Sequence, residues 1–315
     1  MTQQFLDLKT LSRLKDLPLV AKTLAHGFLH GVHNSIQRGV GIEFSQYRVY
    51  EPGDELSKID WKLFARSDRY FVREAERESD INVWLIIDNS ASMQQKSTFS
   101  SINRQSQDQN QQGISKFDYA RMLSATLAYL GQKQGDNVGL FGVSTAKQHF
   151  LPALGGERHF QKILISLAQM QSGGVFPSVD MLKTQLHQMQ KSGLIVVISD
   201  FYQFDQDSVN PLINLVCSAA NARTEVIAMQ LESQDELTFP YSGTLIIEDL
   251  ETKKELKVSA KQVKTHYLNA RQAFNEQLTQ KLSKHQVKHW PINIDQPMDE
   301  SLFNYLNIRQ KQGNS

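Results

Sequence analysis

Three oxygen-bearing side chains follow a short apolar segment of the sequence. The segment Val83–Ile87 is rich in branched and aromatic residues, and it ends at Asp88, with Ser90 and Ser92 at alternate positions beyond. Carboxylate and hydroxyl oxygens are the ligands that Mg²⁺ and Mn²⁺ prefer, and both ions keep positions open for water or for a partner's carboxylate. The pattern therefore predicts a divalent-cation site. The competing interpretation is a metal-free helix N-terminus, at which Ser and Asp cap backbone N–H groups.

A second aspartate stands in a matching context. The apolar segment Gly193–Ser199 is followed directly by Asp200, as Val83–Ile87 is followed by Asp88. Both segments have the composition of buried strands, and ligands of open α/β sheets bind at the carboxyl ends of strands. We therefore expect Asp88 and Asp200 at the same edge of one sheet, which favours a cation site over two unrelated caps.

The spacing Asp88-x-Ser90-x-Ser92 resembles the first element of the metal-ion-dependent adhesion site of von Willebrand factor A-type domains. The resemblance implies a further ligand, a threonine from a glycine-rich loop between the two aspartates. In this chain the loop Ser172–Ser178 has Val175 at the expected threonine position, and Ser178 is the alternative ligand. The implied set is therefore Asp88, Ser90, Ser92, Asp200 and Ser178, or else a degenerate site that has lost its cation.

Composition excludes several classes of function. The chain has 315 residues, of which 40% are hydrophobic, and its 34 basic and 33 acidic residues give a net charge of +1. Such a balance provides no bulk attraction for nucleic acid or an anionic membrane. The single cysteine, Cys217, excludes an intramolecular disulfide. The sequence has no apolar run of membrane-spanning length and no signal-peptide pattern, so we expect a cytoplasmic protein without a transmembrane segment.

Strand-like and helix-like segments alternate from residue 81 onward. Strands are predicted at 83–87, 137–143, 194–198 and 224–231, and helices at 116–134, 157–171, 179–191 and 208–221. This alternation is typical of a Rossmann-like α/β fold, with a mostly parallel sheet covered by helices on both faces. We expect residues 81–315 to form this domain and residues 1–80 to form an N-terminal helix followed by short strands and loops.

Other segments depart from the alternation. Residues 94–115 form a Gln/Ser-rich insert, expected to be mobile and interpreted either as a tolerated insertion or as a lid. Residues 240–258 predict a β-hairpin with its turn near Thr252 and Lys253, and residues 260–285 predict a long polar helix. A last strand at 287–294 and a closing helix at 301–309 complete the expected order.

Several motifs before the first sheet strand occur together in one known family. Arg48-Val-Tyr-Glu-Pro-Gly-Asp-Glu55 is followed by Ile59-Asp-Trp-Lys-Leu-Phe-Ala-Arg66 and by Val72-Arg-Glu-Ala-Glu76. In this order they closely resemble the bacterial family catalogued as domain of unknown function fifty-eight. The resemblance implies a von Willebrand A-like fold and a genetic association with MoxR-type AAA+ ATPases.

Enzyme motifs are largely missing from the sequence. There is no P-loop, no Gly-x-Ser-x-Gly elbow and no arrangement of a nucleophilic cysteine with histidine. We therefore predict a non-enzymatic adaptor whose bound Mg²⁺ or Mn²⁺ takes an acidic side chain of a partner, with a MoxR-type ATPase and a client protein as partners. Two alternatives remain open, namely a metal-assisted phosphoryl hydrolase that uses Asp88 and a structural scaffold with a degenerate metal site.

Overall fold

A computed structural model of the chain provides the fold. It describes residues 47–49, 70–73, 81–97, 113–177, 182, 185, 189, 193–202, 211–220, 224–298 and 301. The predicted helices at 179–191 and 301–309 fall largely outside these residues, as do the expected N-terminal helix and most of the Gln/Ser-rich insert.

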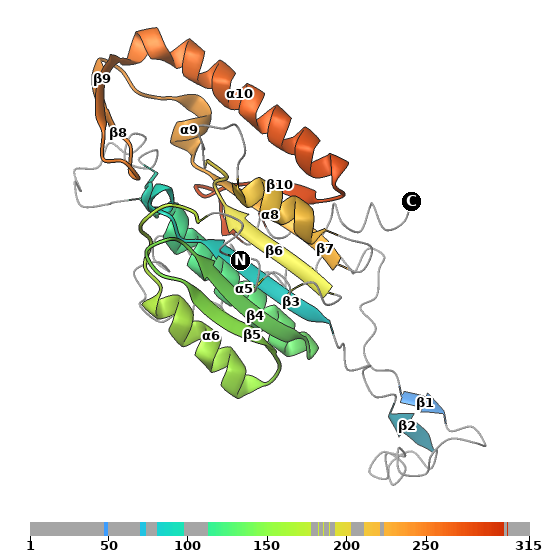
Figure 1. Cartoon of the computed structure of the whole chain (residues 1–315). Coiled ribbons are helices and arrows are strands. Elements are labelled where there is room, and N and C mark those ends of the chain that lie inside the picture. The colour runs from blue at the N-terminus through green and yellow to red at the C-terminus, as the bar shows by residue number, and fades with distance from the viewer. Residues whose placement is uncertain are drawn as a thin grey trace, which may run out of the picture.

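A six-stranded sheet forms the centre of the molecule, with the strand order β10-β7-β6-β3-β4-β5 (Figure 1). Every neighbouring pair is parallel except β4 and β5, which run antiparallel at one edge. This arrangement confirms the expected von Willebrand A-like α/β architecture. The strands are β3 (Asn82–Asp88), β4 (Asn137–Val143), β5 (His149–Leu154), β6 (Gly193–Ser199), β7 (Thr224–Glu232) and β10 (Lys288–Asn293).

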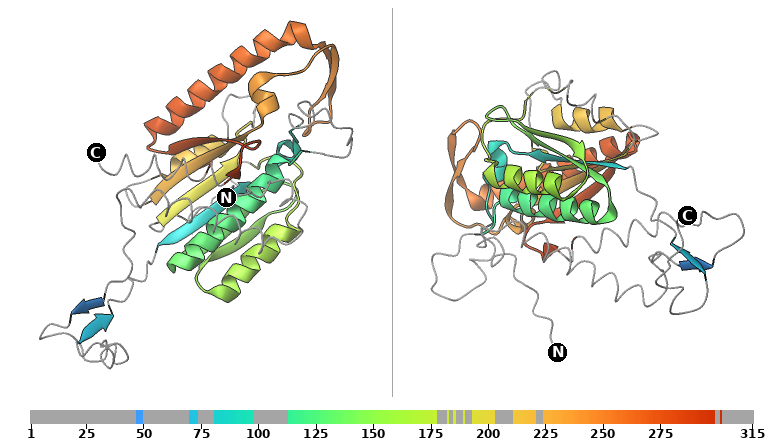
Figure 2. Two further views of the ribbon diagram at one scale, coloured as in Figure 1. Left: turned by 180° about the vertical axis from the view of Figure 1, so that it is seen from behind. Right: turned by 90° about the horizontal axis from the view of Figure 1, so that it is seen from below.

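The central strands are apolar through most of their length because helices cover both faces of the sheet. On β3, Val83, Leu85 and Ile87 pack into one core, whereas Trp84 and Ile86 pack into the other. The helices α5 (Lys116–Gln134) and α6 (Glu157–Gln169) cover the first face. The helices α8 (Pro211–Ala219) and α10 (Ala260–Lys284) cover the second, and Figure 2 shows α8 opposite α5 and α6.

Helix α5 begins and ends where its sequence dictates. The Ser115 hydroxyl accepts a hydrogen bond from the Asp118 N–H at 3.0 Å, which caps the first turn. Gly135 closes the helix in the left-handed conformation, with φ of 80°, a conformation that glycine adopts without steric cost. Lys116 is therefore the first helical residue, and it is fully buried.

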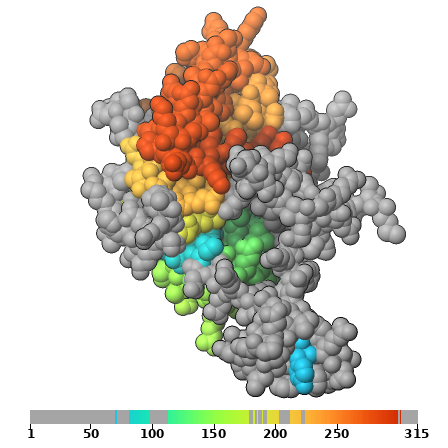
Figure 3. All heavy atoms as spheres, turned by 90° about the vertical axis from the view of Figure 1, so that its right-hand side faces the viewer, coloured from blue at the N-terminus to red at the C-terminus, as the bar shows by residue number. Residues whose placement is uncertain are grey.

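A separate β-hairpin precedes α10, as predicted. Its strands are β8 (Thr244–Glu248) and β9 (Glu255–Ser259). In both Figure 1 and the left view of Figure 2, the hairpin turn lies beside the short 3-10 helix η2 (Ala91–Gln94). Helix α10 buries only Ala260, Arg271, Leu278 and Leu282, so most of its surface faces solvent (Figure 3).

Two elements of the domain were not predicted. Strand β5 contains Pro152, which argues against a strand except at an edge, where its missing N–H is not needed. Helix α9 (Gln234–Thr238) has five residues, too few to show helical periodicity. In the N-terminal segment, β1 (Tyr47–Val49) and β2 (Phe71–Arg73) form a two-stranded antiparallel sheet.

Candidate functional site

The structure places Asp88 and Asp200 side by side at one edge of the sheet. Asp88 is the last residue of β3, and Asp200 directly follows β6. These strands are parallel neighbours, with Ile87 opposite Ile198, so both aspartates leave the carboxyl edge together. Both side chains are buried, with exposures of 0% and 1%. Two buried carboxyl groups in adjacent strands create a demand for a proton or a cation.

The carboxyl group of Asp88 is held at both oxygens. Oδ2 accepts a 2.6 Å hydrogen bond from the Ser199 hydroxyl, and Oδ1 accepts a 2.9 Å hydrogen bond from the Ser90 N–H. Burial and the nearby charge of Asp200 nevertheless outweigh these donors and raise the pKa of Asp88 to about 6.

The serines of the loop after β3 do not behave as simple helix caps. Ser90 is the N-cap residue of η2, yet within the described residues its hydroxyl makes no capping hydrogen bond. Instead, the hydroxyl oxygens of Ser90 and Ser92 lie 3.0 Å apart and share a hydrogen bond. The metal-free capping interpretation therefore does not account for the Ser90 hydroxyl.

The glycine-rich loop packs against the loop that carries these serines. The Gly173 N–H donates to the Asn89 carbonyl at 2.8 Å, and the Ala91 N–H donates to the Gly174 carbonyl at 2.9 Å. Gly174 has φ of 69°, and a Cβ there would lie 2.6 Å from Thr145 Oγ1, so only glycine fits.

Val175 supplies no side-chain oxygen at this position. Its N–H donates to Thr145 Oγ1 at 3.0 Å, and its side chain is 42% exposed. Ser178, the alternative ligand, lies outside the described residues. The structure thus brings together Asp88, Ser90, Ser92 and Asp200 but provides no protein oxygen from Val175.

A buried lysine, which the sequence did not single out, contacts the same aspartate. Lys116 Nζ lies 3.4 Å from Asp200 Oδ2 and 2.7 Å from Glu236 Oε1, and the lysine is 0% exposed. Burial alone lowers the pKa of this ammonium, but the charges of Asp200 and Glu236 outweigh that effect and raise it. Lys116 is therefore a permanent cation inside the site.

The ion pairs continue to Arg271 on α10. Arg271 Nη2 lies 2.8 Å from Glu232 Oε1, and Arg271 Nη1 lies 3.6 Å from Glu236 Oε1. Helix α9 holds Glu236 in place through a capping box, in which the Ser233 N–H donates to Glu236 Oε2 at 2.8 Å. The ring of Tyr202 lies between the two cations, 5.5 Å from Lys116 Nζ and 5.2 Å from the Arg271 guanidinium carbon.

A further carboxyl group comes from the hairpin turn. Burial, followed by the charges of Asp88 and Asp200, raises the pKa of Glu251 to about 7. Among the described residues, the site and its surroundings include the carboxyl groups of Asp88, Asp200, Glu232, Glu236 and Glu251 and the cations Lys116 and Arg271. A divalent cation would offset part of the negative charge of these carboxyl groups.

The donor set fits a hard cation only in part. Among the described residues, no three histidine, cysteine, aspartate or glutamate side chains converge into a ligand set. Two carboxylates and two hydroxyls are nevertheless oxygen ligands of the type that Mg²⁺ and Mn²⁺ use, with water completing the shell. Asp88, Ser90, Ser92 and Asp200 would therefore hold an ion together with water.

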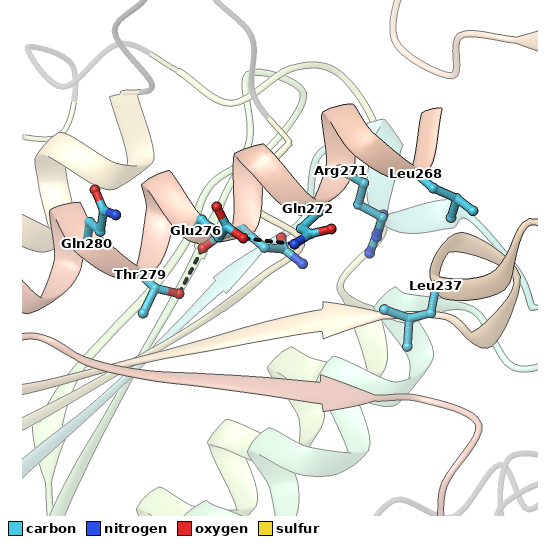
Figure 4. A pocket seen from close by; sticks show the side chains of 8 residues that line it. Leu237, Leu268, Arg271, Gln272, Glu276, Thr279 and Gln280 are labelled. Carbon is cyan, nitrogen blue, oxygen red and sulfur yellow. Dashed lines mark hydrogen bonds between the residues drawn. The ribbon is translucent and has the colours of Figure 1, made fainter. Parts of the chain in front are cut away.

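An open pocket of about 680 Å³ is lined mainly by residues of α10. Figure 4 shows Leu237 of α9 facing a row of polar side chains from α10, with Arg271 among them. Gln272 Nε2 donates to Glu276 Oε1 at 2.9 Å, so part of this polar surface is internally paired. The pocket contains no cluster of nucleophilic or metal-binding groups among its lining residues.

Solved structures with a similar fold are remote in sequence. Protein BatB from Bacteroides thetaiotaomicron is 12% identical, with a TM-score of 0.43 over 73% of this chain and 99% of that chain. The von Willebrand A domain of SpRpn10 is 13% identical, with a TM-score of 0.36 over 70% of this chain and 93% of that chain. Neither match transfers a site or a partner.

No helix in the described part of the chain is long and apolar enough to span a bilayer.

Sequence relatives are closer. The uncharacterized protein Rv1480 of Mycobacterium tuberculosis is 27% identical over 252 residues, which cover 78% of this chain and 72% of that protein. The uncharacterized protein YeaD of Bacillus subtilis is 26% identical over 140 residues, which cover 44% of this chain and 28% of that protein. Residues 46–284 match the family described as "Protein of unknown function DUF58", and the chain belongs to this family.

Proposed function

We propose that this chain is a non-enzymatic interaction module that binds Mg²⁺ or Mn²⁺ and, through it, an acidic group of a protein partner. The observation that carries the proposal is the pair of buried carboxyl groups, Asp88 and Asp200, beside the hydroxyls of Ser90 and Ser92. Among the described residues at this edge, the named carboxyl groups outnumber the cations Lys116 and Arg271, and a bound cation would offset part of their negative charge.

Each residue has a separate task in this proposal. Ser199 and the Ser90 N–H fix the orientation of the Asp88 carboxylate. Lys116 neutralises part of the charge of Asp200 and holds that carboxylate in place, so Asp200 approaches an ion most readily through water. When bound, the ion supplies a positive position that a partner's carboxylate can fill.

By family resemblance, the partner is a MoxR-type AAA+ ATPase, and this chain acts as its adaptor by presenting a client protein for remodelling. An acidic side chain on the ATPase or the client would occupy the open position of the cation. Such contact would be charge-assisted, and it would require the metal because a carboxylate gains little beside Asp88 and Asp200 without it.

The two alternative functions receive less support. A phosphoryl hydrolase that uses Asp88 as nucleophile needs an acid/base carboxylate two residues later, and that position is Ser90. A scaffold with a degenerate metal site is the second alternative. It predicts that metal changes neither stability nor binding.

Thermal unfolding under a Mg²⁺ and Mn²⁺ titration tests the metal site. Binding to the folded state alone stabilises it by about 2.7 kcal/mol when free metal is a hundredfold above its dissociation constant. We expect wild type and Glu157→Gln, which changes an exposed carboxylate on α6, to gain this stability, and Asp88→Asn to lose the response. Equal responses of all three proteins would refute the site.

A further inference from the structure

The turn of the β8–β9 hairpin is held in a defined conformation by Asp249. Its Oδ1 accepts hydrogen bonds from the Glu251 N–H at 2.9 Å and the Thr252 N–H at 3.2 Å, and its Oδ2 accepts one from the Thr252 hydroxyl at 2.7 Å. The Lys253 N–H also donates to the Asp249 carbonyl at 2.8 Å. These bonds fix the backbone of Glu251 at the turn, and the turn lies beside η2 in Figures 1 and 2.

Glu251 directs part of its carboxyl group inward, although it comes from a surface turn. Its Oε1 is buried and finds no hydrogen-bond partner in the described part of the chain. The hairpin strands that carry it are largely exposed, with Ile246 at 68% and Leu256 at 63%. A buried carboxyl oxygen without a donor is unfavourable and calls for a compensating positive group.

Neighbouring negative charges increase the need for a positive group beside this oxygen. Burial, followed by the charges of Asp88, Asp200 and Asp249, raises the pKa of Glu251 to about 7. In the described part of the chain the carboxyl groups of Asp88, Asp200 and Glu251 do not converge into a ligand set. A cation held by Asp88 and the two serines would reverse the sign of the charge near Glu251 and attract its carboxylate.

We propose that Glu251 is a built-in ligand of the cation site, which occupies the position that a partner's carboxylate must take. This inference rests on the proposed metal site and adds how partner binding to that site is regulated. The hairpin then has two positions, one with Glu251 on the cation and one with Glu251 displaced by an external carboxylate. Because the tethered side chain has a high effective concentration, only a partner with additional contacts would displace it.

The exposed strands make such a displacement physically accessible. Ile247 pairs with Leu256 across the hairpin, and both are exposed on one face, while Ile246 is exposed on the other. Segments that bury little apolar surface open at a lower free-energy cost than core elements. The hairpin can therefore move without disturbing the six-stranded sheet.

Mn²⁺ is the probe in the test, because water-proton relaxation shows how much water is bound to it. We compare wild type, Glu251→Gln and the control Glu255→Gln, an exposed glutamate on β9 of the same hairpin. We expect Glu251→Gln to weaken Mn²⁺ binding by about tenfold, the loss of about 1.4 kcal/mol. Water-proton relaxation per bound Mn²⁺ should rise, because water replaces the carboxylate. Glu255→Gln should match wild type in both measurements.

A second titration measures N-acetylglutamate binding to each Mn²⁺-loaded protein. We expect tighter binding to Glu251→Gln than to wild type, because the built-in competitor is gone. If wild type binds Mn²⁺ through Asp88 but Glu251→Gln matches it in Mn²⁺ affinity, relaxation and N-acetylglutamate binding, the built-in ligand is refuted and the metal site stands. If wild type binds no Mn²⁺, both proposals fall.

Discussion

At the scale of single residues, the charge of Asp88 links metal binding to pH. Its folded-state pKa of about 6 lies above the ordinary aspartate value of 3.8, so between these values the folded state binds more protons than the unfolded state. When a chelator removes the metal, the stability contributed by protonated Asp88 is fully present below pH 3.8 and is lost as the pH rises through about 6. Metal binding should show the opposite trend, because protons and cations compete for the same oxygens.

Calorimetric titration of Mg²⁺ at pH 5, 6 and 7.5 measures this competition. We expect affinity to increase across the series and to level off above the pKa of Asp88. Ser199→Ala removes the hydroxyl that lowers this pKa, so its affinity should level off at a higher pH than that of wild type. An affinity that does not change between pH 5 and 7.5 would show that Asp88 is not a ligand.

Lys116 gives a second prediction at this scale. Lys116→Met removes the ammonium between Asp200 and Glu236 and leaves two buried carboxylates without it. Breaking a buried pair in this way costs about 3–5 kcal/mol. Urea unfolding should show this loss for Lys116→Met but not for Lys133→Met, which changes an exposed lysine at the other end of α5. Added Mg²⁺ should recover more stability in Lys116→Met than in wild type, and an unchanged midpoint would contradict the role of Lys116.

At the scale of elements, the pairing of β3 with β6 fixes the distance between the two aspartates. Gly193 allows this pairing, because a Cβ there would lie 2.1 Å from the Asn82 carbonyl oxygen. We expect Gly193→Ala to reduce stability by about 1–3 kcal/mol or more through overpacking and to weaken Mn²⁺ binding. Gly173→Ala is the control, because its Cβ would come no closer than 3.9 Å to another group. Equal denaturation midpoints for the two variants would refute this role.

The contact of β10 with α10 predicts sensitivity to acid. His289 Nε2 lies 2.9 Å from Gln230 Oε1, its Nδ1 lies 2.9 Å from Thr279 Oγ1, and burial lowers its pKa to about 4. The unfolded state therefore takes up a proton first, and stability should fall as pH drops from 6.5 toward 4. The stability contributed by Asp88 changes with pH in the opposite direction in this range. The test is therefore the difference in unfolding free energy between wild type and His289→Gln, measured with chelator present. A constant difference from pH 7 to 4 would contradict the prediction.

The elements themselves were predictable where local sequence decides structure. The predicted bounds of β4 and α5 match the structure, since β4 is continuously apolar and α5 has a serine cap and a terminal glycine. Strand β5 and helix α9 were missed, because one is an edge strand with a proline and the other has too few residues for a periodic pattern. Strand β5 is held by its pairing with β4, and the short helix α9 is held by the capping box of Ser233 and Glu236.

At the scale of the whole molecule, the same division applies to the candidate site. Asp88 and Asp200 could be placed from sequence because each ends an apolar segment. Lys116 could not, because it lies 84 residues from Asp200 and 120 residues from Glu236 along the chain. Glu251 was equally hidden, since its turn resembles any exposed hairpin turn until the fold brings it near Asp88.

Partner binding is the prediction that belongs to this scale. A purified MoxR-type ATPase should be captured by wild type and by Glu157→Gln, and much less by Asp88→Asn, all at one fixed Mg²⁺ concentration. Keeping the metal constant matters because removal of Mg²⁺ would also disturb nucleotide binding by the ATPase. Equal capture by Asp88→Asn would show that the partner docks elsewhere.

The strand order also determines when the molecule can fold. Strand β3 is the first strand of the sheet to be synthesised, yet Asn82 pairs with Asn137 on one side and with Gly193 on the other. Both edges of this apolar strand therefore remain open on the ribosome until β4 and then β6 have emerged. Such long-range parallel pairing slows folding and exposes aggregation-prone edges. Nascent chains that end before about residue 200 should depend on holding chaperones, whereas full-length chains should be released from them.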